Sequence, residues 1–355
     1  MAEQLSASQR TNIFNLSTRQ NYQMLAKKSV TGGAQSIEFE IPKARYLSNI
    51  WVKVKAIVNM KHASKTSVAT EALEPFRIFD RITLDLNNGF APYTATGEMI
   101  GIYNALAFNG KPVLENVGAY RKVEEHLASA TGIDNTLEFC IQLPLTLNKR
   151  DTTGLILAQN QTTLINARFD VTANGLNMFR ELEKDGFTME IKKVEVEAMT
   201  ETFSIPSNPN GRPDISAIKL CIGRTDSITA GGQHIIKMVT GSIYRKMIMY
   251  ITDENGAPVD TDFITSNIEV LFNQADVNYA VSPTMLRAIN NFEYGFELPK
   301  GVYVLDFSNN GIPNYGGSRD LIDSGNLSEL WVRFTTTDGG KVHILNETIS
   351  RLTAK

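Results

Sequence analysis

The sequence is poor in the residues that build most chemical sites. Among 355 residues it has 2 cysteines, 4 histidines and 2 tryptophans. Two cysteines exclude a disulfide framework and a cysteine-based zinc site. No two of the histidines have the spacing of a metal-binding motif. We therefore predict that the protein is not an enzyme, and that it holds no catalytic residue, metal or cofactor.

Long hydrophobic runs and a strong net charge are also missing. No stretch approaches the ~18 apolar residues that span a bilayer, and no apolar core of a signal peptide is visible. The net charge of −3 argues against a polyanion binder, so we expect no direct sequence-specific binding of nucleic acid. Hydrophobic residues make up 42% of the chain, which is enough for two cores. We expect a protein made in a cytoplasm.

The chain is rich in segments that alternate apolar and polar residues with period two. This pattern predicts half-buried β-strands. The segments are 37–41, 50–61, 82–86, 137–141 and 165–171 in the first half, and 243–251, 268–272, 301–307, 330–334 and 342–344 in the second. Asp338-Gly339-Gly340 predicts a hairpin turn between the last two. The fold class is therefore all-β, with few short helices, as two β-sandwiches.

Each half also contains one compact amphipathic helix. In the first half, Thr96 is a plausible N-cap before an apolar stripe, Met99, Ile102, Tyr103 and Leu106. In the second half, Ser282-Pro283 is a strong helix start before a similar stripe, Met285, Leu286, Ile289 and Phe292. The same order of strands and helix in both halves indicates a repeated module.

Breaks in composition predict the domain boundaries. Residues 204–213 hold three prolines and a glycine, which cannot form a helix or a central strand. We predict an N-terminal basic arm or helix at 1–35, a first module at 36–204, a linker and lead-in at 205–233, and a second module at 234–355.

The predicted arm is polar and basic. No acidic residue occurs between Glu3 and Glu38, whereas four basic ones do: Arg10, Arg19, Lys27 and Lys28. One interpretation is a frayed terminus outside the core. The other is a segment that contacts an anionic surface, either lipid headgroups or nucleic acid.

Three stretches of the sequence resemble a known family. They are Gly97–Leu106 with Gly110-Lys-Pro, Leu143–Leu145 with Asp151–Ala158 and the strand to Val171, and the helix after Pro283 running into Leu298–Tyr303. In order, and together with the polar arm, they resemble the major capsid proteins of tectiviruses, bacteriophages with an internal membrane. The likeness is greatest to tectiviruses of Gram-positive hosts.

The resemblance implies two tandem eight-stranded jelly rolls standing upright in an icosahedral capsid. A homotrimer would form a pseudo-hexagonal capsomer, with the basic arm facing the inner viral membrane. Partners would be the chain itself, neighbouring capsomers, vertex (penton) proteins and minor membrane-associated capsid proteins. The location would be the virion shell, after synthesis in the host bacterial cytoplasm.

Two other classes of function compete with this one. A receptor- or carbohydrate-binding β-sandwich would need a site such as the acidic loop Asp253–Asp262, whose oxygen atoms could bind calcium, although the register of an EF-hand is missing. A cupin-like enzyme would need clustered histidines, and no His-x-His pair exists.

Overall fold

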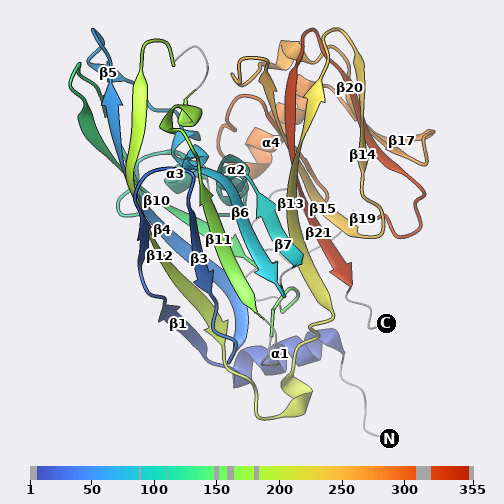
Figure 1. The fold of residues 1–355 in the computed structure, drawn as a ribbon. Coiled ribbons are helices and arrows are strands. Elements are labelled where there is room, and N and C mark those ends of the chain that lie inside the picture. Colours follow the sequence, from blue (N-terminus) through green and yellow to red (C-terminus); the bar gives the residue numbers. More distant parts are fainter. Residues whose placement is uncertain are drawn as a thin grey trace, which may run out of the picture.

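The protein forms two upright β-sandwiches that stand side by side (Figure 1). The structure is a computed structural model, and it describes residues 6–87, 89–108, 110–147, 152–157, 164–179, 184–308 and 321–351. In both sandwiches the chain crosses repeatedly between two facing sheets, which is the path of a jelly roll. The predicted fold class, a tandem double jelly roll, is confirmed.

The first roll spans Gln20 to Phe203. One of its sheets has the order β1-β12-β4-β10-β8, with β2 also paired to β12, and the other the order β7-β6-β11-β3. Their bounds are β1 Gln20–Met24, β2 Lys28–Val30, β12 Thr188–Phe203, β4 Tyr46–Lys61, β10 Ile133–Pro144 and β8 Arg121–Val123, then β7 Phe90–Ala95, β6 Phe79–Leu86, β11 Ile165–Val171 and β3 Ser36–Glu40.

The second roll spans Ala217 to Arg351. One of its sheets has the order β18-β15-β21-β13, with β19 also paired to β15, and the other the order β14-β20-β16-β17. Their bounds are β18 Val302–Asp306, β15 Ile243–Asp253, β21 Gly340–Arg351, β13 Ala217–Ile228 and β19 Ile322–Asp323, then β14 Gln233–Met238, β20 Leu330–Thr335, β16 Ile268–Phe272 and β17 Asp276–Val281.

Helices and short elements fill the connections. The α-helices are α1 Ala7–Ser17, α2 Gly97–Phe108, α3 Gly110–Leu114 and α4 Pro283–Tyr294. The short elements are η1 Glu74–Ile78, η2 Gly175–Met178, η4 Pro209–Gly211, η5 Thr261–Phe263, and the strand pair β5 Ser67–Val68 with β9 His126–Leu127. Helix α2 directly follows β7, and α4 directly follows β17, so each roll has a helix at the same place in its path.

Alternation in the sequence builds the core. In β4 the side chains of Val52, Val54, Ala56, Val58 and Met60 all point inward and are at most 1% exposed. An apolar face of this kind packs against a second sheet. Strands β6 and β11 of the facing sheet supply that contact, because their side chains also alternate between buried and more exposed positions.

The two rolls share one nine-stranded sheet. Strand β13 of the second roll pairs in parallel with β7 of the first, through Tyr93 opposite Cys221 and Thr94 opposite Ile222. Backbone hydrogen bonds therefore run across the boundary between the rolls, which fixes their relative orientation more firmly than a flexible linker would.

The strand registers of the two rolls correspond residue by residue. In the first roll β4 carries a bulge against β12 at Ser48, and in the second β15 carries one against β21 at Arg245. At these bulges Glu201 lies opposite Asn49, and Glu347 lies opposite Lys246. Glu201 and Glu347 are thus equivalent positions of the two rolls.

The strand order departs from the predicted boundaries in one respect. The first strand of each roll lies outside its predicted module, because β1 and β2 fall in the predicted arm and β13 falls in the predicted linker. These strands have weak alternation: β1 is a mostly exposed edge strand, and β13 begins only after the proline-rich segment. Two further expectations need correction.

The predicted hairpin at Asp338-Gly339-Gly340 is wrong. The strands before and after it, β20 and β21, belong to different sheets, so the chain crosses the sandwich there. A side chain at Gly340 would lie 2.1 Å from the carbonyl oxygen of Thr252, so close approach between strands explains the glycine.

The N-terminal segment is also not separate from the core. Helix α1 is capped by Ser6 in a capping box with Gln9, and its Phe14 is only 1% exposed. The Phe14 ring packs edge-on against Tyr46 and Phe203. This contact holds α1 across one end of the first roll (Figure 1).

Candidate functional site

The junction between the two rolls is built around helix α2. Its N-cap Thr96 accepts a hydrogen bond from the backbone N–H of Met99, and most of its residues are buried. Asn104 fastens it to β10 by two reciprocal hydrogen bonds with the backbone of Gln142, at 2.7 and 2.8 Å. A side chain at Gly101 would lie 2.6 Å from the Phe76 ring, so glycine is what permits this packing.

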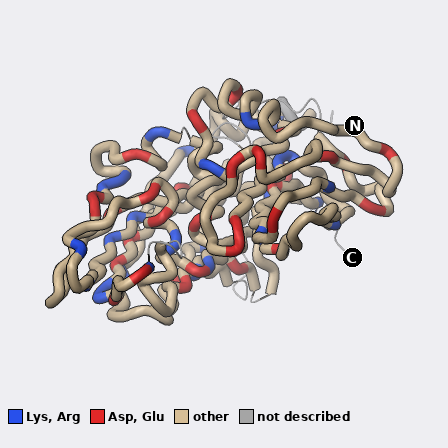
Figure 2. Tube along the Cα trace, turned by 90° about the horizontal axis from the view of Figure 1, so that it is seen from above, with Lys and Arg blue, Asp and Glu red and all other residues tan. Residues whose placement is uncertain are grey.

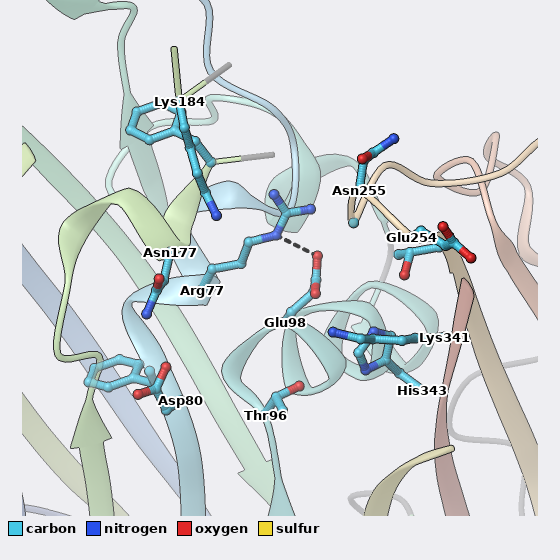
Figure 3. A pocket seen from close by; sticks show the side chains of 14 residues that line it. Arg77, Asp80, Thr96, Glu98, Asn177, Lys184, Glu254, Asn255, Lys341 and His343 are labelled. Carbon is cyan, nitrogen blue, oxygen red and sulfur yellow. Dashed lines mark hydrogen bonds and ion pairs between the residues drawn. The ribbon is translucent and has the colours of Figure 1, made fainter. Parts of the chain in front are cut away.

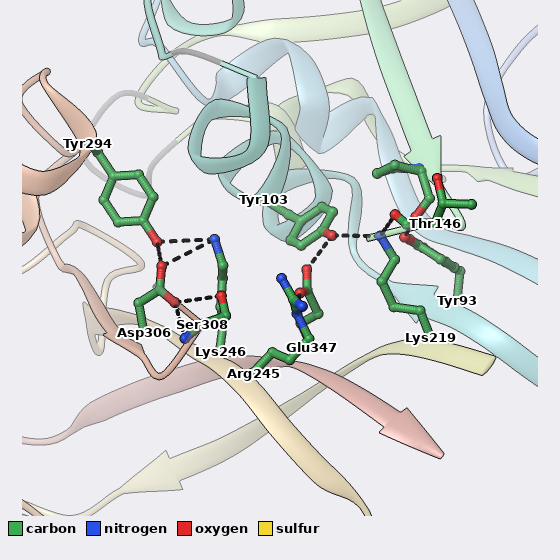
Figure 4. A network of polar contacts seen from close by, with 11 residues as sticks. Tyr93, Tyr103, Thr146, Lys219, Arg245, Lys246, Tyr294, Asp306, Ser308 and Glu347 are labelled. Atoms are coloured by element: carbon green, nitrogen blue, oxygen red, sulfur yellow. Dashed lines mark hydrogen bonds and ion pairs between the residues drawn. The ribbon is translucent and has the colours of Figure 1, made fainter. Parts of the chain in front are cut away.

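A buried ionic network crosses the junction (Figure 4). Glu347 on β21, 4% exposed, accepts a 2.7 Å hydrogen bond from Nε of Arg245. On its other oxygen it accepts the hydroxyl of Tyr103 from α2. Lys219 on β13, 2% exposed, donates to the Tyr103 hydroxyl at 3.1 Å and to the carbonyl of Thr146 at 2.9 Å. Polar groups of each roll thereby form hydrogen bonds with buried polar groups of the other.

The network keeps its carboxylate charged. Burial raises the pKa of Glu347, but the positive charges of Lys219, Arg245 and Lys246 outweigh it and hold that pKa at about 2. Burial lowers the pKa of Lys219, and Glu347 opposes that change. A buried charge that loses its partner is strongly destabilising, so the network stabilises only the assembled junction.

A second ion pair continues the network toward α4. Lys246 lies 3.2 Å from the Oδ2 atom of Asp306, and the same oxygen accepts a 2.6 Å hydrogen bond from the hydroxyl of Tyr294 at the end of α4. Charge from Lys246 and hydrogen bonds from Tyr294 and Ser308 outweigh burial and lower the pKa of Asp306. Each of the two helices is therefore fastened by a tyrosine hydroxyl, Tyr103 on α2 and Tyr294 on α4 (Figure 4).

A cleft opens between the rolls beside the network (Figure 3), with a volume of about 290 Å³. Arg77 from η1 donates to Glu98 of α2 at 2.7 Å, to the carbonyl of Met178 at 3.1 Å and to the hydroxyl of Tyr250 on β15 at 3.4 Å. His343 stacks on Tyr250, and burial lowers its pKa to about 4. Through its hydrogen bond to Tyr250, Arg77 of the first roll thus already contacts the second roll.

The acidic loop uses its oxygen atoms internally. Asp253 accepts the backbone N–H of Ala257, and Asp260 caps η5 and pairs with Lys300 at 3.0 Å. Within the described ranges, no three histidine, cysteine, aspartate or glutamate residues are grouped so as to hold a metal ion. Asp260 therefore tethers its turn to the loop before β18, within the second roll.

The four predicted basic residues of the arm do not form one cluster. Arg10 is half-buried on α1, and Arg19 is exposed, with its backbone bonded to Ser204. Lys27 forms a 2.7 Å ion pair with Glu195, and Lys28 donates to the carbonyl of Glu38 at 2.6 Å. Over the whole molecule acidic and basic residues are interspersed, as Figure 2 shows.

Sequence periodicity did not predict the junction network. Lys219, Arg245 and Glu347 are charged residues within strands, and pattern alone cannot show that a second roll covers the face on which they lie. The helix stripe at Met99, Tyr103 and Leu106 was the one usable clue, and it is buried as predicted.

The stripe of α4 behaves differently. Leu286 is buried, but Met285, Ile289 and Phe292 are 57%, 38% and 88% exposed. The predicted stripe is present on α4, but within one chain only the side that carries Leu286 meets protein. No helix in the described ranges is long and apolar enough to cross a membrane.

Known proteins match this chain in structure alone. No protein-family model and no curated protein sequence matches it. The STIV MCP aligns with a TM-score of 0.66 at 12% identity, over 94% of this chain and 97% of that chain. STIV is Sulfolobus Turreted Icosahedral Virus. VP54 of PBCV-1 aligns with a TM-score of 0.66 at 8% identity, over 95% of each chain.

A third match comes from a bacteriophage. The major capsid protein P2 from Bacteriophage PM2 aligns with a TM-score of 0.54 at 10% identity, over 95% of this chain and 99% of that chain. At such identities these likenesses establish the fold, which is that of the double jelly-roll capsid proteins.

Proposed function

We propose that the chain is the major capsid protein of an icosahedral virus, and that three copies form a pseudo-hexagonal capsomer. One observation carries the proposal: two rolls of equivalent register are locked together by a continuous sheet and a buried ionic network. Three such chains offer six similar rolls around a three-fold axis, and closed symmetry satisfies their contacts. The shared fold with known capsid proteins supports this role.

The geometry favours a structural role over a catalytic one. At the junction Glu347 already pairs with Arg245 and accepts the hydroxyl of Tyr103 from the other roll. In the cleft Arg77 already pairs with Glu98 and donates to the hydroxyl of Tyr250 of the other roll. Their arrangement strengthens the contact between modules. Self-association, neighbouring capsomers, vertex (penton) proteins and minor membrane-associated capsid proteins are the proposed partners, within the virion of a bacteriophage.

Measurement of mass and shape tests the core proposal. Purified protein should sediment as a trimer at micromolar concentration, and class averages from electron microscopy should show a hexagonal outline with three-fold symmetry. A strictly monomeric species over that range, or averages without three-fold symmetry, would reject the trimeric capsomer.

We also propose that the end of the molecule with α1 faces an internal membrane, as in tectiviruses. Arg10 on α1 and the exposed Arg19 after it lie at this end, and each basic residue near an anionic leaflet contributes about 1 kcal/mol. Lys28 is exposed farther from this end, where β2 pairs with the middle of β12. Lys27 contributes less, because Glu195 already neutralises it. Many copies in a shell would add their weak contacts together.

Co-sedimentation with vesicles tests the membrane contact. Assembled particles or trimers should bind vesicles that contain anionic lipid, and the double variant Arg10→Gln, Arg19→Gln should bind several-fold less. The matched control is Lys61→Gln with Lys65→Gln. These exposed lysines lie at and just after the end of β4 that is farthest from α1, and this variant should bind as the wild type does. Equal binding by both double variants would contradict the proposal.

A further inference from the structure

Helix α4 is the equivalent of helix α2, residue for residue. Both start at a hydroxyl N-cap, Thr96 or Ser282, that accepts a backbone N–H at 3.3 Å. At the same spacing from the cap, each carries a buried asparagine that binds its own roll by two reciprocal backbone hydrogen bonds. These are Asn104 with Gln142 on β10, and Asn290 with Val304 on β18 at 2.9 Å.

This alignment pairs buried residues of α2 with exposed residues of α4. Met99, Tyr103 and Leu106 are 2–3% exposed, because α2 lies in the junction against the second roll. Their equivalents Met285, Ile289 and Phe292 are 57%, 38% and 88% exposed. Because burial of large apolar side chains is favourable, α4 presents a face suited to packing against a second roll.

The surface that receives α2 is repeated as well. In the second roll, α2 and its neighbours cover the outer side of β13, β21 and β15, where Cys221, Leu345 and Ile248 are fully buried. Strand registers map these three onto Tyr22, Met199 and Trp51 of the first roll. Within one chain Tyr22 is 53% exposed, and Met199 and Trp51 are only partly buried.

The strand edges complete the pattern. The junction joins β7, the edge of one roll, to β13, the edge of the next, in parallel. Their equivalents are β17 and β1, which are the terminal strands of their sheets. These two strands lie at opposite sides of the molecule (Figure 1), as a head-to-tail contact between copies requires.

We infer that the α4–β17 surface of one copy docks on the β1–β12–β4 surface of the next, repeating the internal junction between subunits. The occupant of each surface is thus a second copy of this chain. Phe292, Ile289 and Met285 cover Trp51, Met199 and Tyr22 of the neighbour, and Tyr279 and Ala280 lie beside Tyr22 and Gln23. This inference rests on the proposed trimer and specifies the residues that close it.

Disruption of the α4 face gives the first test. Phe292→Asp places a charge in the interface, and because Phe292 is 88% exposed in the single chain, the fold should survive. The wild type should have the mass of a trimer by light scattering, and the variant one third of it. The matched control Val239→Asp, at a 70% exposed residue in the loop between β14 and β15, should remain trimeric.

The outcomes distinguish failure of the proposed trimer from failure of this interface alone. A monomeric wild type would reject the proposed trimer and this interface together. A trimeric wild type with an equally trimeric Phe292→Asp variant would overturn this interface alone and leave the capsomer standing.

Thiol cross-linking gives a second test that does not depend on a disruptive change. Gln23 and Ala280 are both exposed in the single chain and face each other in the inferred register. The double variant Gln23→Cys, Ala280→Cys should form covalent dimers and trimers on oxidation, whereas a mixture of the two single variants should stop at dimers. Each single variant alone should not cross-link, because the contact is head-to-tail. Cross-linking of Ala280→Cys with itself, or none in the double variant, would refute the inference.

Discussion

The buried carboxylate of Glu347 offers the sharpest test of how the two rolls are held together. Glu347→Gln keeps the shape of the side chain but removes the charge that Arg245 and Lys219 face. The pKa of Glu347 is about 2 rather than 4.5. Since a difference of one in pKa corresponds to about 1.4 kcal/mol, the charged form contributes about 3 kcal/mol. Loss of one partner of a buried ion pair costs a similar ~3–5 kcal/mol.

The repeat supplies the control. Glu201 is the equivalent residue of the first roll and is also 4% exposed, but it accepts from the neutral side chains of Gln20 and Trp51. Glu201→Gln weakens hydrogen bonds from neutral donors to a carboxylate and leaves no cation unpaired, so it should cost only about 1–2 kcal/mol. The two substitutions are chemically identical, so the difference between them isolates the buried cations at the junction.

Urea unfolding at pH 7 measures this difference. The molecule has one tryptophan in each roll, Trp51 in β4 and Trp331 in β20, so single-tryptophan variants report each roll separately. In the wild type both probes should change together. In Glu347→Gln the second roll should unfold first, at lower urea, and the acid sensitivity between pH 4.5 and 2 should shrink. Equal destabilisation by Glu347→Gln and Glu201→Gln, with coincident probes, would refute the assigned role of the network.

Other predictions concern neighbouring parts of the junction. Gly101→Ala should lower the free energy of unfolding by about 1–3 kcal/mol, because the added methyl group meets the Phe76 ring, and an unchanged urea midpoint would contradict the close packing. The pKa of His343 lies at about 4, below the ordinary 6.5, so the unfolded chain binds its proton first and stability falls as pH drops from 6.5 to 4. His343→Gln should therefore lose less stability over that range in thermal melts than the wild type, and parallel curves would count against this origin.

Sequence periodicity predicted most of the fold because inward and outward side chains alternate in nearly every long strand. It was weakest where the environment of a strand is set by another part of the molecule. β1 is a mostly exposed edge strand, so Gln20–Met24 lacks the alternation that indicates a strand. The sequence alone therefore places these residues in the predicted N-terminal arm. β20 and β21 look like a hairpin locally, but the facing sheets separate them.

The junction was harder to predict for the same reason. Lys219 and Glu347 look like solvent-facing residues in sequence, and only the packing of α2 turns that face into an interior. The apolar stripe on α4 is the opposite case, because most of it stays exposed in the single chain. Met285, Ile289 and Phe292 form a correct amphipathic helix, but pattern alone cannot distinguish a face that meets its own chain from one that meets another.

The position of β21 has a consequence for how the chain folds as it is synthesised. Residues Gly340–Arg351 form the last of the described strands, and they pair with β13 on one side and β15 on the other. Until the ribosome has released them, β13 is joined to the finished first roll only by its short contact with β7, and the second roll has open edges. Open edges in a half-made chain promote aggregation. The first roll can close once Phe203 has emerged, but the second must wait until Arg351 has emerged, so the edges of β13 and β15 stay open for as long as β21 is still inside the ribosome.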